Sequence, residues 1–136
     1  MPQPVHFEIA GTNPEALVAF YRDIFGWRIE PWGGGEFPYW TITTAELDRG
    51  PGEWRTGPGI DGGLTARQGE APGPDAPING FVIVVDVPDC DGYVQKVTDA
   101  GGSVAMPAQD MAGIGRVAYL KDPDGNLFGI IQPPQT

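Results

Sequence analysis

Residues 5–27, VHFEIAGTNPEALVAFYRDIFGW, decide how the fold begins. Apolar and polar side chains alternate in residues 5–9, which is typical of a strand with one buried face. His6 and Glu8 lie on the other face of that strand. The strand therefore has an apolar side that packs into a core and a second side that carries groups capable of chemistry.

A helix is predicted directly after this strand. Asn13 is a favourable N-cap residue, and Pro14 fits the first helical position, where no backbone N–H is needed. Gly26 is typical of a helix C-terminus, and residues 27–30 then indicate a strand. We expect the apolar side chains that recur at helical spacing to pack on a sheet; they are Leu17, Phe20, Tyr21, Ile24 and Phe25.

The same pattern returns in the second half of the chain. Residues 81–87, FVIVVDV, predict a strand buried on both faces, and the helix after it ends at Gly101 and Gly102. Its apolar stripe consists of Cys90, Tyr93, Val94, Val97 and Ala100. Further strands are expected over residues 39–44, 63–67, 103–106, 116–121 and 126–131.

Each half is thus predicted as a βαβββ unit, which indicates an internal duplication. The fold class is α+β, and the 136 residues are enough for one domain. We expect unit one over about residues 1–68, a linker over about 69–78 and unit two over about 79–136.

The composition excludes several classes of partner. The formal net charge is −10, and no cluster of Lys and Arg supplies the charge that drives binding to nucleic acid or anionic membranes. No apolar run approaches the roughly 20 residues of a membrane span, and the start MPQP lacks signal-peptide features, so we expect a cytoplasmic protein. The single Cys90 is expected to be a buried thiol without a chemical role.

Three short motifs carry a resemblance to a known family. They are residues 6–9 (HFEI), 20–27 (FYRDIFGW) and 122–129 (DPDGNLFG). On these motifs the sequence resembles the vicinal oxygen chelate superfamily, which contains glyoxalase I, extradiol dioxygenases, fosfomycin-resistance proteins and bleomycin-binding proteins. It is most similar to the bacterial glyoxalase-related group. The resemblance implies two βαβββ units in a curved mixed sheet around a cavity, and a homodimer is expected because exposed sheet edges need cover.

The resemblance also implies four metal-ligand positions, one in the first strand and one in the last strand of each unit. His6 matches the first position, and imidazole is a competent ligand. The other three positions fall on Gly63, Gly80 and Gly129. Because three protein ligands are the usual minimum, we expect neither a metal ion nor another cofactor. The glycines also predict free space in the cavity for a larger ligand.

His6 and Glu8 are the candidate catalytic residues. A His and a carboxylate on one strand face can act as a general base and as the group that orients it. A Glu in this position needs water or a partner, and His6 is its nearest candidate. The alternatives are that His6 is a structural residue, or that the face is polar and filled with water without turnover.

Four further residues are candidate substrate-binding groups: Trp40, Trp54, Arg67 and Arg116. The two Trp side chains can line an opening for a planar or apolar ligand. Equally, Trp40 can belong to the core and Trp54 can pin a loop. The two Arg side chains can bind an anionic group, or they can only neutralise nearby carboxylates.

Two functions from different classes remain open. The first is a small-molecule enzyme of glyoxalase-like type, an isomerase or lyase in which His6 and Glu8 transfer a proton. The second is a binding protein that sequesters a ligand, as the bleomycin-binding proteins do. Covalent catalysis is not expected, because the motif Gly-x-Ser-x-Gly does not occur in the sequence.

Overall fold

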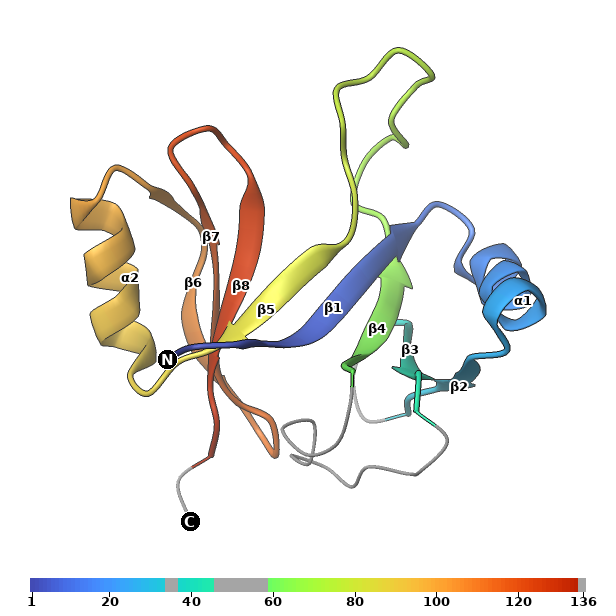
Figure 1. The fold of residues 1–136 in the computed structure, drawn as a ribbon, viewed down its shortest axis with the longest axis horizontal. Coiled ribbons are helices and arrows are strands. Elements are labelled where there is room, and N and C mark those ends of the chain that lie inside the picture. The colour runs from blue at the N-terminus through green and yellow to red at the C-terminus, as the bar shows by residue number, and fades with distance from the viewer. Residues whose placement is uncertain (34–36, 46–58, 135–136) are drawn as a thin grey trace. The chain divides into compact units, whose positions relative to one another are not determined.

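The chain forms two successive series of secondary structure, each a strand, a helix and three further strands (Figure 1). The computed structural model describes residues 1–33, 37–45 and 59–134. These residues divide into two compact units. The N-terminal unit comprises residues 6–33, 37–45 and 59–81, and the C-terminal unit comprises residues 1–5 and 82–134. No helix in the described ranges is long and apolar enough to cross a membrane.

The N-terminal unit is a helix on a four-stranded sheet. Its elements are β1 (Pro4–Gly11), α1 (Pro14–Phe25), β2 (Arg28–Pro31), β3 (Tyr39–Thr43) and β4 (Asp61–Ala66). The strand order is β2-β3-β4-β1. The pair β1 and β4 is parallel, whereas β3 runs antiparallel to both β2 and β4.

Helix α1 begins and ends where the sequence predicts. The Asn13 side chain accepts a hydrogen bond from the Ala16 N–H at 3.4 Å. Gly26 closes the helix with a φ of +70°, and its N–H donates to the Arg22 carbonyl at 2.9 Å. A residue with a Cβ adopts this left-handed conformation only at a cost, which explains the glycine at this position.

The expected apolar stripe of α1 is only partly buried, and this corrects the sequence prediction. Val18 is buried, whereas Phe20 is 50% exposed and Ile24 is 55% exposed. The helix contacts the core through Leu17, Val18 and Tyr21. At about 100° per residue, a contact face centred on these three side chains leaves positions 20 and 24 at its edge.

The core of the N-terminal unit lies between α1 and one face of its sheet. It consists of the buried side chains of Phe7, Ile9, Val18, Ile29, Ile42 and Leu64. Since Phe7 and Ile9 alternate with His6 and Glu8 along β1, the opposite face of the strand holds the two polar side chains.

The C-terminal unit repeats this arrangement. Its elements are β5 (Val82–Asp86), α2 (Cys90–Asp99), β6 (Ser103–Met111), β7 (Gly115–Lys121) and β8 (Leu127–Gln132). The strand order is β5-β8-β7-β6, with β5 parallel to β8 and the remaining pairs antiparallel.

Two strands of this unit differ from the sequence prediction. β5 is not buried on both faces, because Ile83 is 44% exposed while Val84 is buried. β6 continues to Met111, five residues beyond its expected end at Met106, through register shifts in its pairing with β7. Cys90 lies buried at the start of α2, as expected, and burial raises the pKa of its thiol.

Candidate functional site

The polar face of β1 carries the two candidate catalytic residues. Val5, Phe7 and Ile9 are buried, whereas the side chains of His6 and Glu8 are 27% and 23% exposed. The distance from His6 Nε2 to Glu8 Oε1 is 3.8 Å. The alternation along β1 therefore brings an imidazole and a carboxylate together within reach of solvent.

Tyr39 joins these residues from the neighbouring part of the sheet, and the sequence analysis did not identify it. Its hydroxyl lies 3.2 Å from His6 Nε2. Tyr39 is the first residue of β3, which pairs with β4, and β4 in turn pairs with β1. The signal in the sequence is a Tyr in a β-rich run, but only the pairing of three strands shows that it meets His6.

The Tyr39 hydroxyl fills the space over Gly63. In the sheet, Gly63 of β4 pairs with Glu8 on one side and with Thr41 on the other. A Cβ added to Gly63 would overlap the Tyr39 hydroxyl. The predicted free space at this position is therefore wrong, because an aromatic side chain of the next strand occupies it.

Gly129 in β8 also lies beside a tyrosine, but the space over it is tight and not overlapped. A Cβ at Gly129 would lie 3.0 Å from Cε1 of Tyr119, its pairing partner on β7, and 3.1 Å from Cγ2 of Val84 on β5. Gly80 differs, because it is exposed and precedes β5. Tyrosines thus lie over two of the three glycine positions.

Burial sets the protonation states of the two hydrogen-bonded groups. Burial lowers the pKa of His6 to about 4, against a smaller opposing effect of the Asp61 carboxylate. Burial also raises the pKa of the Tyr39 hydroxyl, and the Glu8 carboxylate adds to that rise. At neutral pH the imidazole is uncharged and the phenol keeps its proton. In this bond either the Tyr39 O–H donates to a lone pair on His6 Nε2, or Nε2–H donates to the Tyr39 oxygen, according to the tautomer of His6.

Asp61 completes the charged surroundings of His6. It is the pairing partner of His6 in the β1–β4 ladder. Its Oδ1 accepts hydrogen bonds from the Thr44 N–H at 2.8 Å and from the Thr44 hydroxyl at 3.2 Å. These bonds hold the carboxylate at the start of β4.

The residues present do not fit the metal site that the resemblance implies. Of the four implied positions only His6 has a ligand atom, and Gly63 and Gly129 lie under tyrosine side chains. Among the residues that the structure describes, no three His, Cys, Asp or Glu side chains gather as metal ligands. We therefore derive no chemical step through a metal ion.

The two Trp candidates are not placed on this face. Trp40 packs against the core of the N-terminal unit and pairs with Leu64, so it lies on the side of β3 opposite Tyr39. This is the core alternative for Trp40. Trp54 lies outside the described residues.

Arg67 holds the ends of two strands together. Its Nη2 donates to the Ala10 carbonyl at 2.9 Å, and its backbone N–H donates to the Gly11 carbonyl at 2.8 Å. Ala10 is four residues beyond His6, about 13 Å along the strand. Arg67 therefore lies beside the start of α1, at a distance from the His6 face. It lines a cavity of about 460 Å³ there with Leu17 and Phe20.

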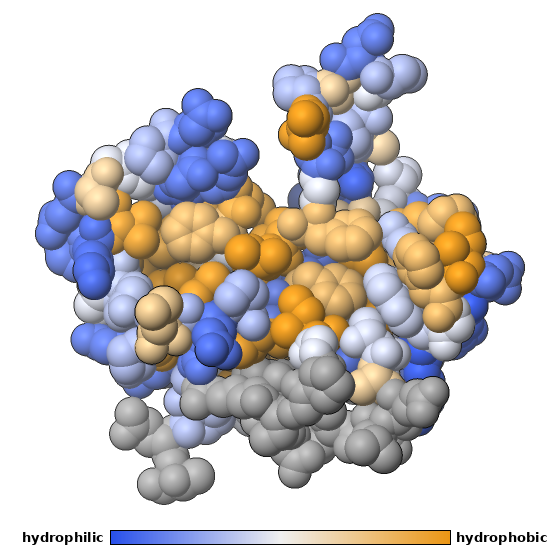
Figure 2. All heavy atoms as spheres, in the orientation of Figure 1, coloured by the Kyte–Doolittle hydropathy of each residue, from blue (hydrophilic) through white to orange (hydrophobic). Residues whose placement is uncertain are grey.

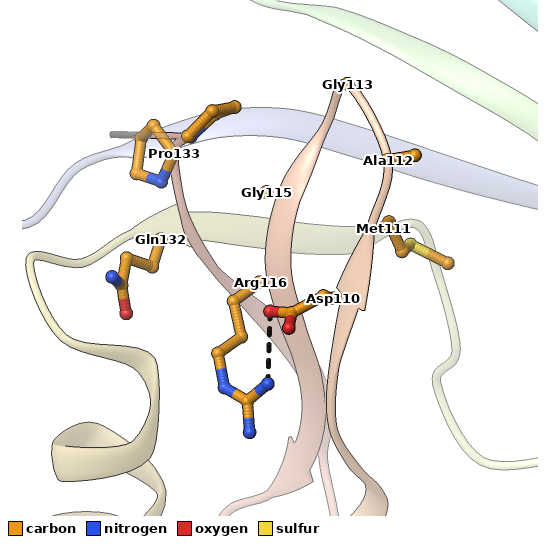
Figure 3. A pocket seen from close by; sticks show the side chains of 9 residues that line it. Asp110, Met111, Ala112, Gly113, Gly115, Arg116, Gln132 and Pro133 are labelled. Carbon is orange, nitrogen blue, oxygen red and sulfur yellow. Dashed lines mark hydrogen bonds and ion pairs between the residues drawn. The ribbon is translucent and has the colours of Figure 1, made fainter. Parts of the chain in front are cut away.

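Arg116 belongs to the C-terminal unit and forms an ion-pair cluster. Its guanidinium contacts Asp91 at 3.0 Å and Asp110 at 3.1 Å. Hydrogen bonds to both carboxylates raise the pKa of Arg116 further. The side chain lines a cavity of about 250 Å³ with Gln132 and Pro133 (Figure 3). The structure thus shows the charge-neutralising alternative for Arg116.

Comparison with known proteins identifies relatives of the whole chain. The family model Glyoxalase/Bleomycin resistance protein/Dioxygenase superfamily matches residues 3–130. A Mycobacterium bovis protein named "Putative glyoxylase CFP32" is 32% identical over 95% of this chain and 45% of its own length. The chain spans about half the length of the curated relatives it matches.

Solved structures share the fold. A superfamily member from Vibrio splendidus has a TM-score of 0.61 at 18% identity, covering 98% of this chain and 100% of its own. Methylmalonyl-CoA epimerase from Mycobacterium tuberculosis has a TM-score of 0.59 at 17% identity, covering 96% of this chain and 87% of its own. The predicted α+β fold class with two βαβββ units is confirmed.

Proposed function

Because the chain belongs to the glyoxalase/bleomycin resistance protein/dioxygenase superfamily, we propose that the face formed by His6, Glu8 and Tyr39 binds a small molecule and transfers a proton on it. Members of this superfamily bind small-molecule ligands. One observation carries the proposal: His6 Nε2 lies 3.2 Å from the Tyr39 hydroxyl and 3.8 Å from Glu8 Oε1, on a face that solvent reaches.

Glu8 is the general base of this proposal. A carboxylate that solvent reaches can take a proton from a bound ligand and return it. His6 is not the base, because an imidazole with a pKa of about 4 is too weak a base to hold a proton at neutral pH; it lies beside Glu8 and forms the hydrogen bond with Tyr39. The sequence left open which of the two residues is the general base, and the proposal gives that role to Glu8.

The ligand class follows from the base. A carboxylate removes a proton from carbon only when a neighbouring carbonyl or carboxyl group stabilises the resulting charge. The proposed reaction is therefore an isomerisation or elimination of a small carbonyl or carboxyl compound, without a metal ion or another cofactor.

A binding protein that sequesters a ligand is the second candidate. The observation that favours it is the cavity of about 460 Å³ beside Leu17, Phe20 and Arg67, which does not include the His6 face. A ligand held there would not meet Glu8.

Solvent deuterium exchange separates these two functions. The protein is incubated in D2O with a panel of small compounds that have a C–H bond next to a carbonyl or carboxyl group, and NMR follows the loss of that proton. Catalysed exchange of at least one compound supports proton transfer. Compounds that bind without any exchange support the binding protein.

We also propose that the chain forms a homodimer and acts in the cytoplasm, as expected from the sequence. The dimer is supported by three half-exposed apolar side chains on α1, those of Phe20, Ile24 and Phe25. Figure 2 shows hydrophobic side chains gathered on the surface over this helix. Exposed apolar surface of this kind is often an interface.

A further inference from the structure

Tyr39 and Gly63 are mutually dependent. The Tyr39 hydroxyl lies where the first atom of any side chain at position 63 would be. Gly63 is buried within β4, so such a side chain has no other direction in which to leave the sheet. The ring of Tyr39 keeps its place only while position 63 has no Cβ.

Without the Tyr39 ring, a side chain at position 63 could approach the His6 imidazole and the Glu8 carboxylate. Gly63 is the direct pairing partner of Glu8, and His6 precedes Glu8 by two residues on the same strand face. Side chains on paired residues of one face approach within about 5 Å. A carboxylate at position 63 would therefore join the His6 imidazole and the Glu8 carboxylate, which is the usual minimum of three protein ligands.

We propose that Tyr39 keeps divalent metal ions off this face and positions the His6 imidazole for a reaction without metal. The role of Tyr39 in catalysis rests on the proposed function, but its exclusion of metal ions does not. Tyr39 acts in two ways. Its ring fills the space that a third ligand would need, and its hydroxyl donates to the nitrogen atom of His6 that would bind the ion.

A titration with Co²⁺ tests the exclusion. Binding is followed by visible absorbance and by paramagnetic broadening of the His6 ring protons, which belong to the only histidine in the sequence. The matched pair is Tyr39→Phe, which keeps the ring, and Tyr39→Ala, which removes it. We expect Tyr39→Ala to bind Co²⁺ about tenfold more tightly than Tyr39→Phe, and Tyr39→Ala/Gly63→Glu about a hundredfold more tightly than the unchanged protein.

The C-terminal unit offers a control for the double substitution. Tyr119 lies over Gly129, although less closely than Tyr39 lies over Gly63, and the partner of Gly129 on β5 is Val84 instead of a glutamate. Tyr119→Ala/Gly129→Glu should therefore gain no Co²⁺ site.

Nitrogen chemical shifts of His6 test the positioning role. In the unchanged protein we expect the shifts of an imidazole protonated on Nδ1, because the proposed role requires Nε2 to accept from the Tyr39 hydroxyl, which lies 3.2 Å away. Tyr39→Phe removes the donor and should move the proton toward Nε2. A residue that only fills space would leave these shifts unchanged when its ring is kept.

Two results would overturn the inference. One is stoichiometric Co²⁺ binding at His6 in the unchanged protein as tight as in the double variant. The other is equal Co²⁺ affinity of Tyr39→Ala and Tyr39→Phe, together with unchanged His6 nitrogen shifts in Tyr39→Phe. Co²⁺ affinity and the His6 nitrogen shifts do not depend on turnover. They therefore test this inference even if the proposed proton transfer is not found.

Discussion

His6 is the residue whose ionisation the structure defines most sharply. Burial lowers its pKa to about 4, so it should remain uncharged down to mildly acidic pH. The groups around it are Glu8 on its own strand, Asp61 on β4 and Tyr39 on β3. Proton NMR of the single histidine measures this pKa directly, and a value near 6.5 would contradict the burial that the structure shows.

The same pKa predicts how stability depends on pH. Between about pH 6.5 and 4 the unfolded chain binds a proton on His6 that the folded chain does not, so stability is complete above pH 6.5 and falls as the pH approaches 4. Because 27% of the side chain is exposed, about 3 kcal/mol is an upper value for this loss. Urea unfolding at several pH values measures it, and His6→Asn is the control in which this component disappears.

Glu8 is the residue on which turnover should depend. Glu8→Gln keeps the size of the side chain and removes the base, so the rate of C–H exchange should fall about 10²–10⁴-fold with ligand affinity retained. His6→Ala should lower the rate as well, because the imidazole that lies between Glu8 and Tyr39 is lost. Equal exchange rates in Glu8→Gln and the unchanged protein would remove Glu8 from the mechanism.

At the residue scale the sequence predicts part of the site. His6 and Glu8 follow from the alternation of one strand, which is a local pattern. Tyr39 does not, because its contact with His6 depends on the register of β3 against β4 and of β4 against β1. Register is set by the packing of the whole sheet, so no local pattern reveals it.

At the scale of elements, α1 shows which apolar positions the fold uses. Val18→Ala should cost about 2 kcal/mol of unfolding free energy, because the side chain is buried in the core. Phe20→Ala should cost about 1 kcal/mol, because half of the ring is exposed. Urea denaturation of both variants measures the difference, and a larger loss for Phe20→Ala would mean that the helix packs through its other side.

The ends of α1 were more predictable than its buried face. Asn13 and Gly26 mark α1 through the local chemistry of caps, and Asp122 fixes the turn between β7 and β8 by accepting from the Asp124 and Asn126 N–H groups at 2.9 Å. The extension of β6 was missed, because its residues gain strand structure from pairing with β7. Burial of a helix face likewise depends on where the sheet contacts it.

At the scale of the whole molecule, the two units share their order of elements and differ in chemistry. The internal duplication was predictable from the restart of the pattern near residue 81. The place of His6 and Glu8 in the first unit was predictable too, since His6 is the only histidine in the sequence, but the pairing of Gly63 with Glu8 and of Gly129 with Val84 was not. Only the N-terminal unit thus places an imidazole and a carboxylate beside its covered glycine.

The apolar face of α1 predicts the assembly. Light scattering at tens of micromolar protein should give the mass of a homodimer. Phe25→Asp should give a monomer, because Phe25 is 58% exposed on the proposed interface, and should lower the stability of its unit only moderately, because its ring contacts Trp27 at 4.9 Å between ring centroids. Val18→Asp would instead unfold the unit, because Val18 is buried, so that variant cannot test the dimer. A monomer at all concentrations of the unchanged protein would contradict the prediction.

The proposed proton transfer by Glu8 takes place on a face from which Tyr39 excludes metal ions. The most direct test is the rate of C–H to C–D exchange, in the compound of the panel that exchanges fastest, before and after treatment of the protein with a strong chelator. We predict the same rate in both samples, because no step uses a metal ion. Loss of exchange after chelation, with recovery on addition of one equivalent of a divalent ion, would contradict the account.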